Sequence, residues 1–263
     1  MQELLKQKKL HKSVKTVSGK TLEQNLKIKI NIDTDVIKSF DDPVVDNAGF
    51  IVMKSNFFNS AIMKTSVISE EFRERYLSDP NHPNVFEGKA VMFEGPEDYH
   101  HRINSNKLKI DENSILMVRG CGPVGYPGSA EVVNMQPPDR LLKEGINALP
   151  TLGDGRQSGT SESPSILNVS PESAVGGDLA IVKTGDKIKI DLNKCTVDIM
   201  ISVTELDKRK KLLPKERFPY PESQTPWQEI FREKVLPFSE GMTIDGASKY
   251  QDIARKHIPR DNH

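Results

Sequence analysis

The segment Gly153–Ser161, with the sequence Gly-Asp-Gly-Arg-Gln-Ser-Gly-Thr-Ser, concentrates the residue types that a catalytic or anion-binding loop needs. Its glycines allow backbone amides to point at an anion, and Ser158, Thr160 and Ser161 offer hydroxyls. It is not a Gly-x-Ser-x-Gly nucleophile motif, since Gln157 precedes the first serine, and no histidine–aspartate pair is placed to activate that serine. On pattern alone, an anion-binding loop and a surface turn fit equally well.

A second glycine-rich segment delivers one carboxylate. Residues 120–125, Gly-Cys-Gly-Pro-Val-Gly, follow an apolar run and match the Gly-x-Gly-x-x-Gly spacing of dinucleotide-binding loops. That site requires a helix to begin at the loop, and Pro123 and Pro127 interrupt one, so we interpret the segment as a turn that allows close approach to its backbone. The turn leads to Glu131, which fits an active-site carboxylate or an ordinary acid in the first turn of a helix, and composition favours the second.

The elements that must position these segments are mostly short strands. Apolar runs between turn signals predict strands at residues 50–53, 60–64, 89–93, 114–118, 180–183 and 197–203. Helical patterns cover residues 70–77, a helix that begins after Pro137-Pro138, a capping-box start at residues 204–207, and residues 228–235 and 247–256. Many short strands with few helices predict an α+β fold that is mostly β: a closed or nearly closed β-barrel with peripheral helices.

The chain divides by pattern into three parts. Residues 1–27 have too few apolar positions to close a core and are typical of the tail of something larger. Residues 28–217 carry the strands of the predicted barrel. A proline-rich link at residues 218–221 leads into a helical C-terminal tail, residues 218–263, which we expect to pack on the barrel.

Charge and cysteine content exclude some classes of protein. Lys plus Arg and Asp plus Glu number 37 each, and this balance argues against nucleic acid as the main partner. Two cysteines, Cys121 and Cys195, indicate neither a disulfide framework nor a four-thiolate metal site. The first residues lack the apolar core of a signal peptide, and no apolar run is long enough to span a bilayer. We expect a cytoplasmic protein without a membrane partner, and an organellar location stays open.

Read together, several motifs resemble the dihydroxy-acid and sugar-acid dehydratase family, specifically its carboxy-terminal half. The wording Gly-Tyr-Pro-Gly-Ser-Ala-Glu at residues 125–131 is more similar to the arabinonate and xylonate branch than to the branched-chain amino-acid branch. The other matching segments are residues 93–99, 118–123, 154–161, 163–166 and 170–174.

The resemblance implies a fold, a reaction and a set of site residues. The fold is the swivelling β/β/α-type barrel, and the reaction is loss of water from a 2,3-dihydroxy acid to give a 2-keto-3-deoxy acid, with Mg²⁺ and an iron–sulfur cluster as cofactors. By resemblance Ser158 is the base that removes the C2 proton, and Glu131 is one Mg²⁺ ligand. Asp154, Arg156 and Thr160 would shape the loop or bind the substrate.

The chain also departs from the family. Its members are about twice as long, and their amino-terminal half carries the cluster cysteines and the remaining Mg²⁺ ligands, which this chain lacks. Residues 1–27 resemble the last stretch of that half. We therefore expect an isolated chain that is inactive without a separate amino-terminal half and homo-oligomeric when complete. A partly apolar, exposed face should surround residues 120–131 and 153–161.

Two alternatives stay open beside this hypothesis. The first is a non-catalytic remnant or assembly module of the same family, which folds but performs no chemistry. The second is a dihydroxy-acid dehydratase of branched-chain amino-acid biosynthesis.

Overall fold

The computed structural model describes residues 1–28, 32–44, 48–157, 162–213 and 220–256. The chain divides into two compact units, Met1–Ala48 and Gly49–His263. The first contains helix α1 (Gln2–Lys6) and helix α2 (Leu22–Asn25), and none of its described residues is buried. Thr21 begins α2 with a capping box that it shares with Gln24. The predicted boundaries at residues 27 and 217 stay a prediction.

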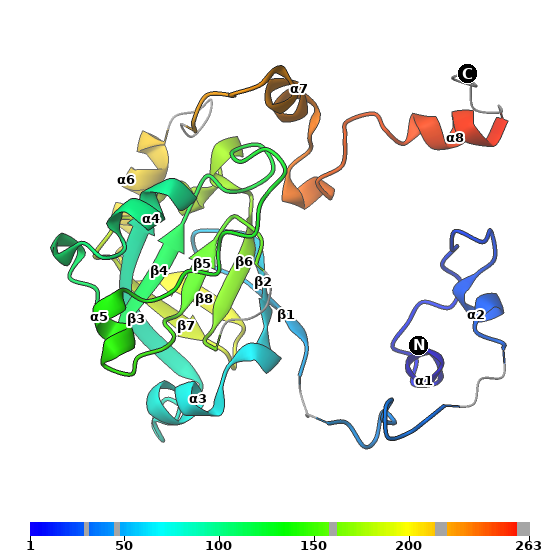
Figure 1. Cartoon of the computed structure of the whole chain (residues 1–263), viewed down its shortest axis with the longest axis horizontal. Coiled ribbons are helices and arrows are strands. Elements are labelled where there is room, and N and C mark those ends of the chain that lie inside the picture. The colour runs from blue at the N-terminus through cyan, green and yellow to red at the C-terminus, as the bar shows by residue number, and fades with distance from the viewer. Residues whose placement is uncertain (29–31, 45–47, 158–161, 214–219, 257–263) are drawn as a thin grey trace. The chain divides into compact units, whose positions relative to one another are not determined.

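The second unit is built on one eight-stranded sheet, in the order β1-β2-β6-β5-β4-β3-β7-β8. Strands β3, β4, β5 and β6 run parallel to one another, and the pairings at either end of the sheet are antiparallel. Figure 1 shows the four parallel strands side by side. The strand bounds are β1 Phe50–Met53, β2 Ser60–Lys64, β3 Val85–Phe93, β4 Ser114–Val118, β5 Thr151–Gly153, β6 Ser165–Ser170, β7 Lys187–Asp191 and β8 Thr196–Ile199.

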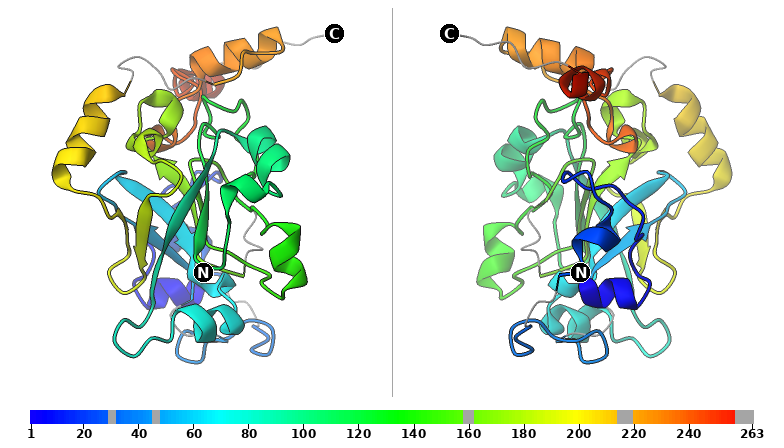
Figure 2. Two further views of the ribbon diagram at one scale, coloured as in Figure 1. Left: turned by 90° about the vertical axis from the view of Figure 1, so that its left-hand side faces the viewer. Right: turned by 90° about the vertical axis from the view of Figure 1, so that its right-hand side faces the viewer.

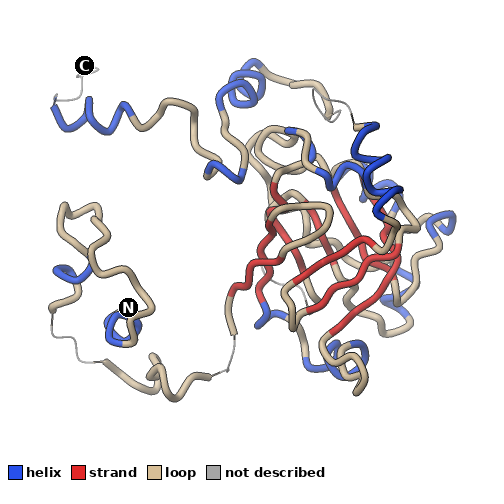
Figure 3. The backbone as a smooth tube through the Cα atoms, turned by 180° about the vertical axis from the view of Figure 1, so that it is seen from behind, coloured by secondary structure: helices blue, strands red, loops and turns tan. Residues whose placement is uncertain are grey.

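The two edges of the sheet meet at a short seam, which confirms the predicted nearly closed barrel. Directly after β1, Lys54 forms an isolated bridge with Thr196 at the start of β8. The Lys54 amide donates to the Cys195 carbonyl at 2.9 Å, and the Val197 amide donates to the Lys54 carbonyl at 2.8 Å. Asn56 extends the seam, because its backbone amide donates to the Asp198 carboxylate. Figure 3 shows the strands curling around the resulting interior.

Strand β4 and the second half of β3, from Ala90 to Phe93, are buried on both faces. Ala90, Met92, Ile115 and Met117 face the barrel interior, in the larger apolar cluster. The residues between them, such as Val91 and Phe93 on β3 and Leu116 and Val118 on β4, belong to a second cluster that also contains residues of helix α5 and of the segment after α4. Burial on both faces explains why β4 is a continuous apolar run rather than an alternating one.

Helices cover the outside of the barrel. Figure 2 shows α6 (yellow) on one side of the barrel and α4 and α5 (green) on the other. The helix bounds are α3 Glu70–Tyr76, α4 Pro96–Arg102, α5 Asp139–Lys143, α6 Val203–Leu212, α7 Pro226–Lys234 and α8 Lys249–Lys256. Short 3₁₀ turns lie at η1 Thr65–Val67, η2 Asn106–Leu108, η3 Ser173–Val175, η4 Asp178–Ile181 and η5 Phe238–Glu240. Within the described residues, no helix has the length and apolar character needed to cross a bilayer.

Two of the predicted elements were wrong. Residues 180–183 are not a strand: Asp178–Ile181 form η4, and the carbonyls of Ala180 and Val182 accept hydrogen bonds from Arg119 instead of a neighbouring strand. The strand predicted over residues 197–203 ends at Ile199. Ser202 then caps α6, because its hydroxyl accepts from the Glu205 amide at 3.1 Å, so the helix begins one residue before the predicted capping box.

Candidate active site at the carboxyl ends of the parallel strands

The segments that the sequence singled out all leave the sheet at one edge. Strands β3, β4, β5 and β6 are mutually parallel, so the residues that follow them lie at the same end of the barrel. Glu94 follows β3, the glycine-rich turn follows β4, Asp154 follows β5 and Glu172 lies just after β6. The carboxyl ends of parallel strands are where α/β proteins usually place their ligands.

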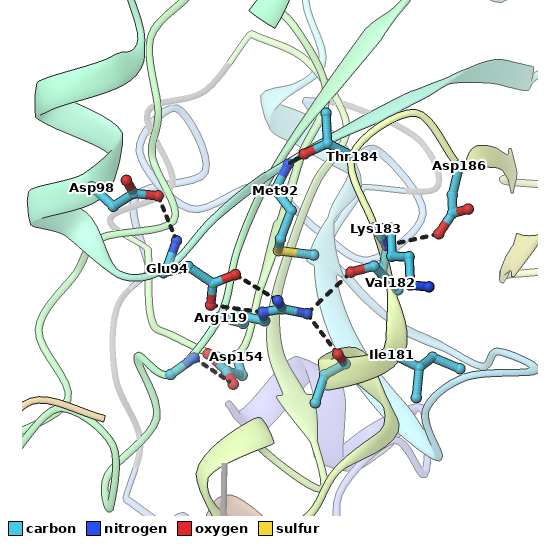
Figure 4. Close-up of polar contacts among 12 residues, drawn as sticks. Met92, Glu94, Asp98, Arg119, Asp154, Ile181, Val182, Lys183, Thr184 and Asp186 are labelled. Atoms are coloured by element: carbon cyan, nitrogen blue, oxygen red, sulfur yellow. Dashed lines mark hydrogen bonds and ion pairs between the residues drawn. The ribbon is translucent and has the colours of Figure 1, made fainter. Parts of the chain in front are cut away.

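Asp154 joins three of these segments. Its side chain is fully buried, and its carboxylate accepts hydrogen bonds from the amides of Gly120 at 3.1 Å, Cys121 at 2.8 Å and Ser173 at 2.8 Å. Figure 4 shows this carboxylate beside the segment that follows β4. Burial raises the pKa of Asp154, against the three amides and the Ser173 side chain, which lower it. The hydrogen-bond partners of Asp154 in the described part of the chain are therefore protein groups. Through them Asp154 fixes the segments after β4, β5 and β6 to one another.

Replacing Asp154 with asparagine should destabilise the chain by about 2 kcal/mol, because an amide nitrogen would face a backbone N–H that needs an acceptor. Urea unfolding followed by circular dichroism would measure the loss. Asp139→Asn is the matched control, since Asp139 is exposed at the start of α5. Equal stability of Asp154→Asn and the wild type would contradict the role given to the three hydrogen bonds.

A second buried carboxyl, that of Glu172, lies against the turn that follows β4. Its Oε2 accepts from the Val124 amide at 3.4 Å, and its Oε1 has no partner among the described residues. A Cβ on Gly122 would lie 1.7 Å from Oε2, so only glycine leaves room for this side chain. Burial and then the charge of Asp154 raise the pKa of Glu172 to about 8. Apart from its place in the Ser-Pro-Glu-Ser segment, no sequence pattern pointed to this residue.

Arg119, at the end of β4, fixes a further segment to this edge. Its guanidinium pairs with the Glu94 carboxylate and donates to the carbonyls of Ala180 at 2.6 Å and Val182 at 3.0 Å (Figure 4). The Arg119 side chain is only 14% exposed, so these bonds replace its hydration. The arrangement ties the ends of β3 and β4 to the η4 segment.

The structure brings Glu131 and Arg156 together. The two residues form an isolated parallel bridge, and the Val133 amide donates to the Arg156 carbonyl at 3.1 Å. The Arg156 side chain turns back, so that its Nε donates to the Ser129 carbonyl at 2.5 Å. Glu131 is exposed, and its carboxylate has no hydrogen bond or ion pair with the described part of the chain. Ser158 and Thr160 lie outside the described residues.

A series of hydrogen bonds between polar side chains fixes Gln157, the residue that precedes Ser158 in the sequence. The Gln157 amide donates to Asn134 at 3.3 Å and accepts from the Ser165 hydroxyl, which is itself within 2.5 Å of the Thr151 hydroxyl. A polar cavity of about 240 Å³ adjoins these side chains, and Asn134 and Thr151 are among the residues that line it. Among the described residues, its lining includes Glu162 but no cationic side chain, so these residues alone make a poor receptor for a carboxylate.

The expected exposed face around the two loops is only partly present. Residues 121–125 are buried, with Val124 packed against Ala174 and Val235, and partly buried residues such as Phe231 of α7 pack on this cluster. Gly128, Glu131 and Arg156 are exposed. The first half of the turn is therefore covered by the chain's own C-terminal segment, and the half that carries Glu131 is open.

Comparison with known proteins shows the family. Residues 35–242 match the model described as "Dihydroxy-acid/6-phosphogluconate dehydratase C-terminal". The chain belongs to this family. The resemblance noted in the sequence is thereby confirmed.

The relatives within this family are dehydratases. The chain is 53% identical to the D-xylonate dehydratase of Caulobacter vibrioides over 99% of its own length, but it spans 43% of that relative. It is 40% identical to the L-arabinonate dehydratase of Rhizobium leguminosarum bv. trifolii over 76% of the chain and 33% of the relative. A dihydroxy-acid dehydratase from Archaeoglobus fulgidus is 33% identical over 77% of the chain and 35% of the relative. The chain thus spans less than half the length of these relatives.

The resemblance implies an iron–sulfur cluster and Mg²⁺, and the residues of this chain suit the second but not the first. Cys121 is fully buried, and burial raises the pKa of its thiol well above its usual range, so it stays a neutral thiol. Cys195 lies in the turn before β8, and two cysteines cannot hold an iron–sulfur cluster with three or four thiolates. The open carboxylate of Glu131 suits a hard cation such as Mg²⁺. In the described part of the chain, no three His, Cys, Asp or Glu side chains converge on one point.

Proposed function

We propose that the chain supplies the base-bearing half of the active site of a sugar-acid dehydratase, a hydro-lyase that converts a 2,3-dihydroxy acid into a 2-keto-3-deoxy acid. One observation supports it most. The fold places Glu131 beside Arg156, two residues before Ser158 in the sequence, at the edge where the parallel strands end. The similarity to D-xylonate and L-arabinonate dehydratases supports a sugar acid over a branched-chain acid as substrate.

The proposal assigns roles to the residues of the site. Ser158, ionised to its alkoxide, removes the C2 proton. The C3 hydroxyl takes up a proton from solvent and leaves as water, and the resulting enol tautomerises to the 2-keto acid. Mg²⁺, when bound, supplies positive charge that lowers the pKa of a nearby hydroxyl. Glu131 is one ligand for it, while Arg156 and Thr160 bind substrate or shape the loop. Asp154 holds the loops in place from the interior.

The site is incomplete in this chain. Mg²⁺ takes about six oxygen ligands, and Glu131 offers one carboxylate. In the proposal, the other ligands and the iron–sulfur cluster belong to the region of the longer relatives that this chain does not match. Turnover then requires that region, as a separate amino-terminal half or in one polypeptide. A homo-oligomeric, cytoplasmic enzyme is the expectation for the complete protein.

Reconstitution tests the proposal. The purified chain should turn over neither D-xylonate nor L-arabinonate. Addition of the amino-terminal region of the Caulobacter vibrioides relative, with Mg²⁺ and a reconstituted cluster, should produce the 2-keto-3-deoxy acid, detected as its semicarbazone. A branched 2,3-dihydroxy acid is the control substrate and should react more slowly. Turnover by the chain alone, or faster turnover of the branched acid, would overturn the corresponding part of the proposal.

The non-catalytic alternative is favoured by one observation. Residues 121–125 are covered by the chain's own C-terminal segment, where an open surface was expected for the missing half. A reconstituted complex that forms stoichiometrically, contains its cluster and Mg²⁺ and still shows no turnover of any of the three acids would decide for this alternative.

A further inference from the structure

The C-terminal segment lies directly against the glycine-rich turn of the candidate site. Beyond the end of α7, Val235 pairs with Ile244 in an isolated antiparallel bridge, so the segment returns on itself. Val235 is buried with Val124 of the turn and Ala174 of η3. This apolar contact places the segment against the turn, but apolar contacts are non-directional and do not fix the orientation of the turn's backbone.

Arg232, on α7, fixes the backbone of the turn through directional hydrogen bonds. Its Nε donates to the Val124 carbonyl at 3.0 Å, and its Nη2 donates to the Gly125 carbonyl at 3.0 Å. Its Nη1 donates to the Ser223 hydroxyl at 2.8 Å, and the guanidinium lies 4.5 Å from the centre of the Tyr220 ring. A planar, five-donor fork can reach two successive carbonyls and stack on an aromatic ring at once, and lysine cannot.

The turn transmits this hold because it is tightly closed. A Cβ on Gly125 would lie 2.4 Å from the Gly120 carbonyl oxygen, so the two ends of the turn are in contact. The Tyr126 amide donates to the Gly122 carbonyl, and the Ser129 amide donates to the Tyr126 carbonyl, each at 2.8 Å. The hydrogen-bonded backbone thus reaches within two residues of Glu131.

We propose that Arg232 is a positioning residue, which fixes the glycine-rich turn from the C-terminal segment and thereby sets the place of the Glu131 carboxylate. That Glu131 binds a cation rests on the proposed function; the hold on the turn does not. Arg232 contacts neither metal nor substrate in this scheme and acts through the backbone of Val124 and Gly125.

Amide hydrogen exchange on the full chain tests the hold. Arg232→Ala should lower the protection of residues 121–129 at least about tenfold, because two charge-assisted hydrogen bonds are lost. Protection of β4 should stay unchanged, and Arg232→Lys should restore part of the protection in the turn. Lys234→Ala is the matched control, since Lys234 is an exposed cation at the end of the same helix, and it should leave the turn as in the wild type.

Unchanged protection of the turn in Arg232→Ala, or a loss that β3 and β4 share equally, would overturn the proposal. If Arg232→Ala does not fold, Arg232→Lys decides, since it should show a smaller loss confined to the turn. In the reconstituted enzyme, Arg232→Ala should raise the Mg²⁺ concentration for half-maximal turnover about tenfold, with a smaller change in kcat at saturating Mg²⁺. An unchanged Mg²⁺ requirement would overturn the link to Glu131. A wild type without turnover would defeat the proposed function, and the exchange measurement would still decide the hold.

Discussion

Glu172→Gln is expected to stabilise the chain at pH 8 to 9 and to leave its stability nearly unchanged at pH 5. Burial raises the pKa of Glu172 from 4.5 to about 8. Below pH 4.5 the folded and unfolded chains both carry the proton. Between 4.5 and 8 the unfolded chain releases its proton while the folded chain retains it, so stability falls as the pH rises. Above 8 both forms are ionised and the loss is complete.

The size of this effect follows from the shift. At about 1.4 kcal/mol per pKa unit, the wild type should lose roughly 3 to 5 kcal/mol of stability between pH 5 and pH 9 through this group. Glutamine stays neutral, and its carbonyl can accept from the Val124 amide as Oε2 does. Asp154, the other buried carboxyl here, is present in both proteins, so its titration is common to both curves.

Urea unfolding at five pH values between 5 and 9 would measure the difference. Glu144→Gln is the matched control, because Glu144 is exposed at the end of α5, and its curve should follow the wild type. Parallel curves for Glu172→Gln and the wild type would show that the folded chain does not hold this proton.

Ser158→Ala is expected to lower kcat of the reconstituted enzyme by roughly 10³-fold, within the range for loss of a general base. In the proposed mechanism the Ser158 alkoxide acts on the C2 proton only in the transition state and adds little to ground-state binding, so KM should change much less than kcat. Initial rates with D-xylonate at saturating Mg²⁺ would measure both constants.

The same loop provides the control for this variant. Ser161→Ala removes a hydroxyl three residues further on, to which the resemblance gives no role, and should keep kcat within about threefold of the wild type. Loss of the C2 proton can be followed directly by exchange with deuterated water, which Ser158→Ala should abolish. Retention of kcat by Ser158→Ala would assign the base to another residue.

The sequence predicted the class of the fold better than its details. Turn-bounded apolar runs gave the barrel, because burial of one face imposes a pattern that the sequence retains. They did not give β6, in which the polar Asn168 divides the apolar residues of the strand. The run at residues 180–183 has the composition of a strand but overlaps η4, and its carbonyls accept hydrogen bonds from Arg119 and not from a neighbouring strand. A long-range hydrogen bond of this kind leaves no local pattern.

For the candidate site, the sequence located the loops and missed what holds them. The density of glycine and hydroxyl residues marked residues 153–161, and the resemblance supplied roles for Ser158 and Glu131. Glu172 and Arg232 carry no local signal, because a carboxyl or a guanidinium in a sequence usually indicates a solvated surface. Both side chains are held by the backbone of Val124, which lies 48 positions from Glu172 and 108 positions from Arg232 in the sequence.

The seam between β1 and β8 has a consequence for how the barrel forms during synthesis. Asn56 and Asp198 are hydrogen-bonded across the seam although they are 142 positions apart in the sequence. Strand β2 likewise cannot pair with β6 until β6 has been synthesised. The β1–β2 hairpin therefore leaves the ribosome long before either of its partners and exposes Phe50 and Val52, which stay largely exposed in the finished fold. Such an unpaired apolar edge is a site for wrong pairing between nascent chains. Slow translation of the residues between β2 and β6 should prolong the exposure of this hairpin and favour aggregation through it.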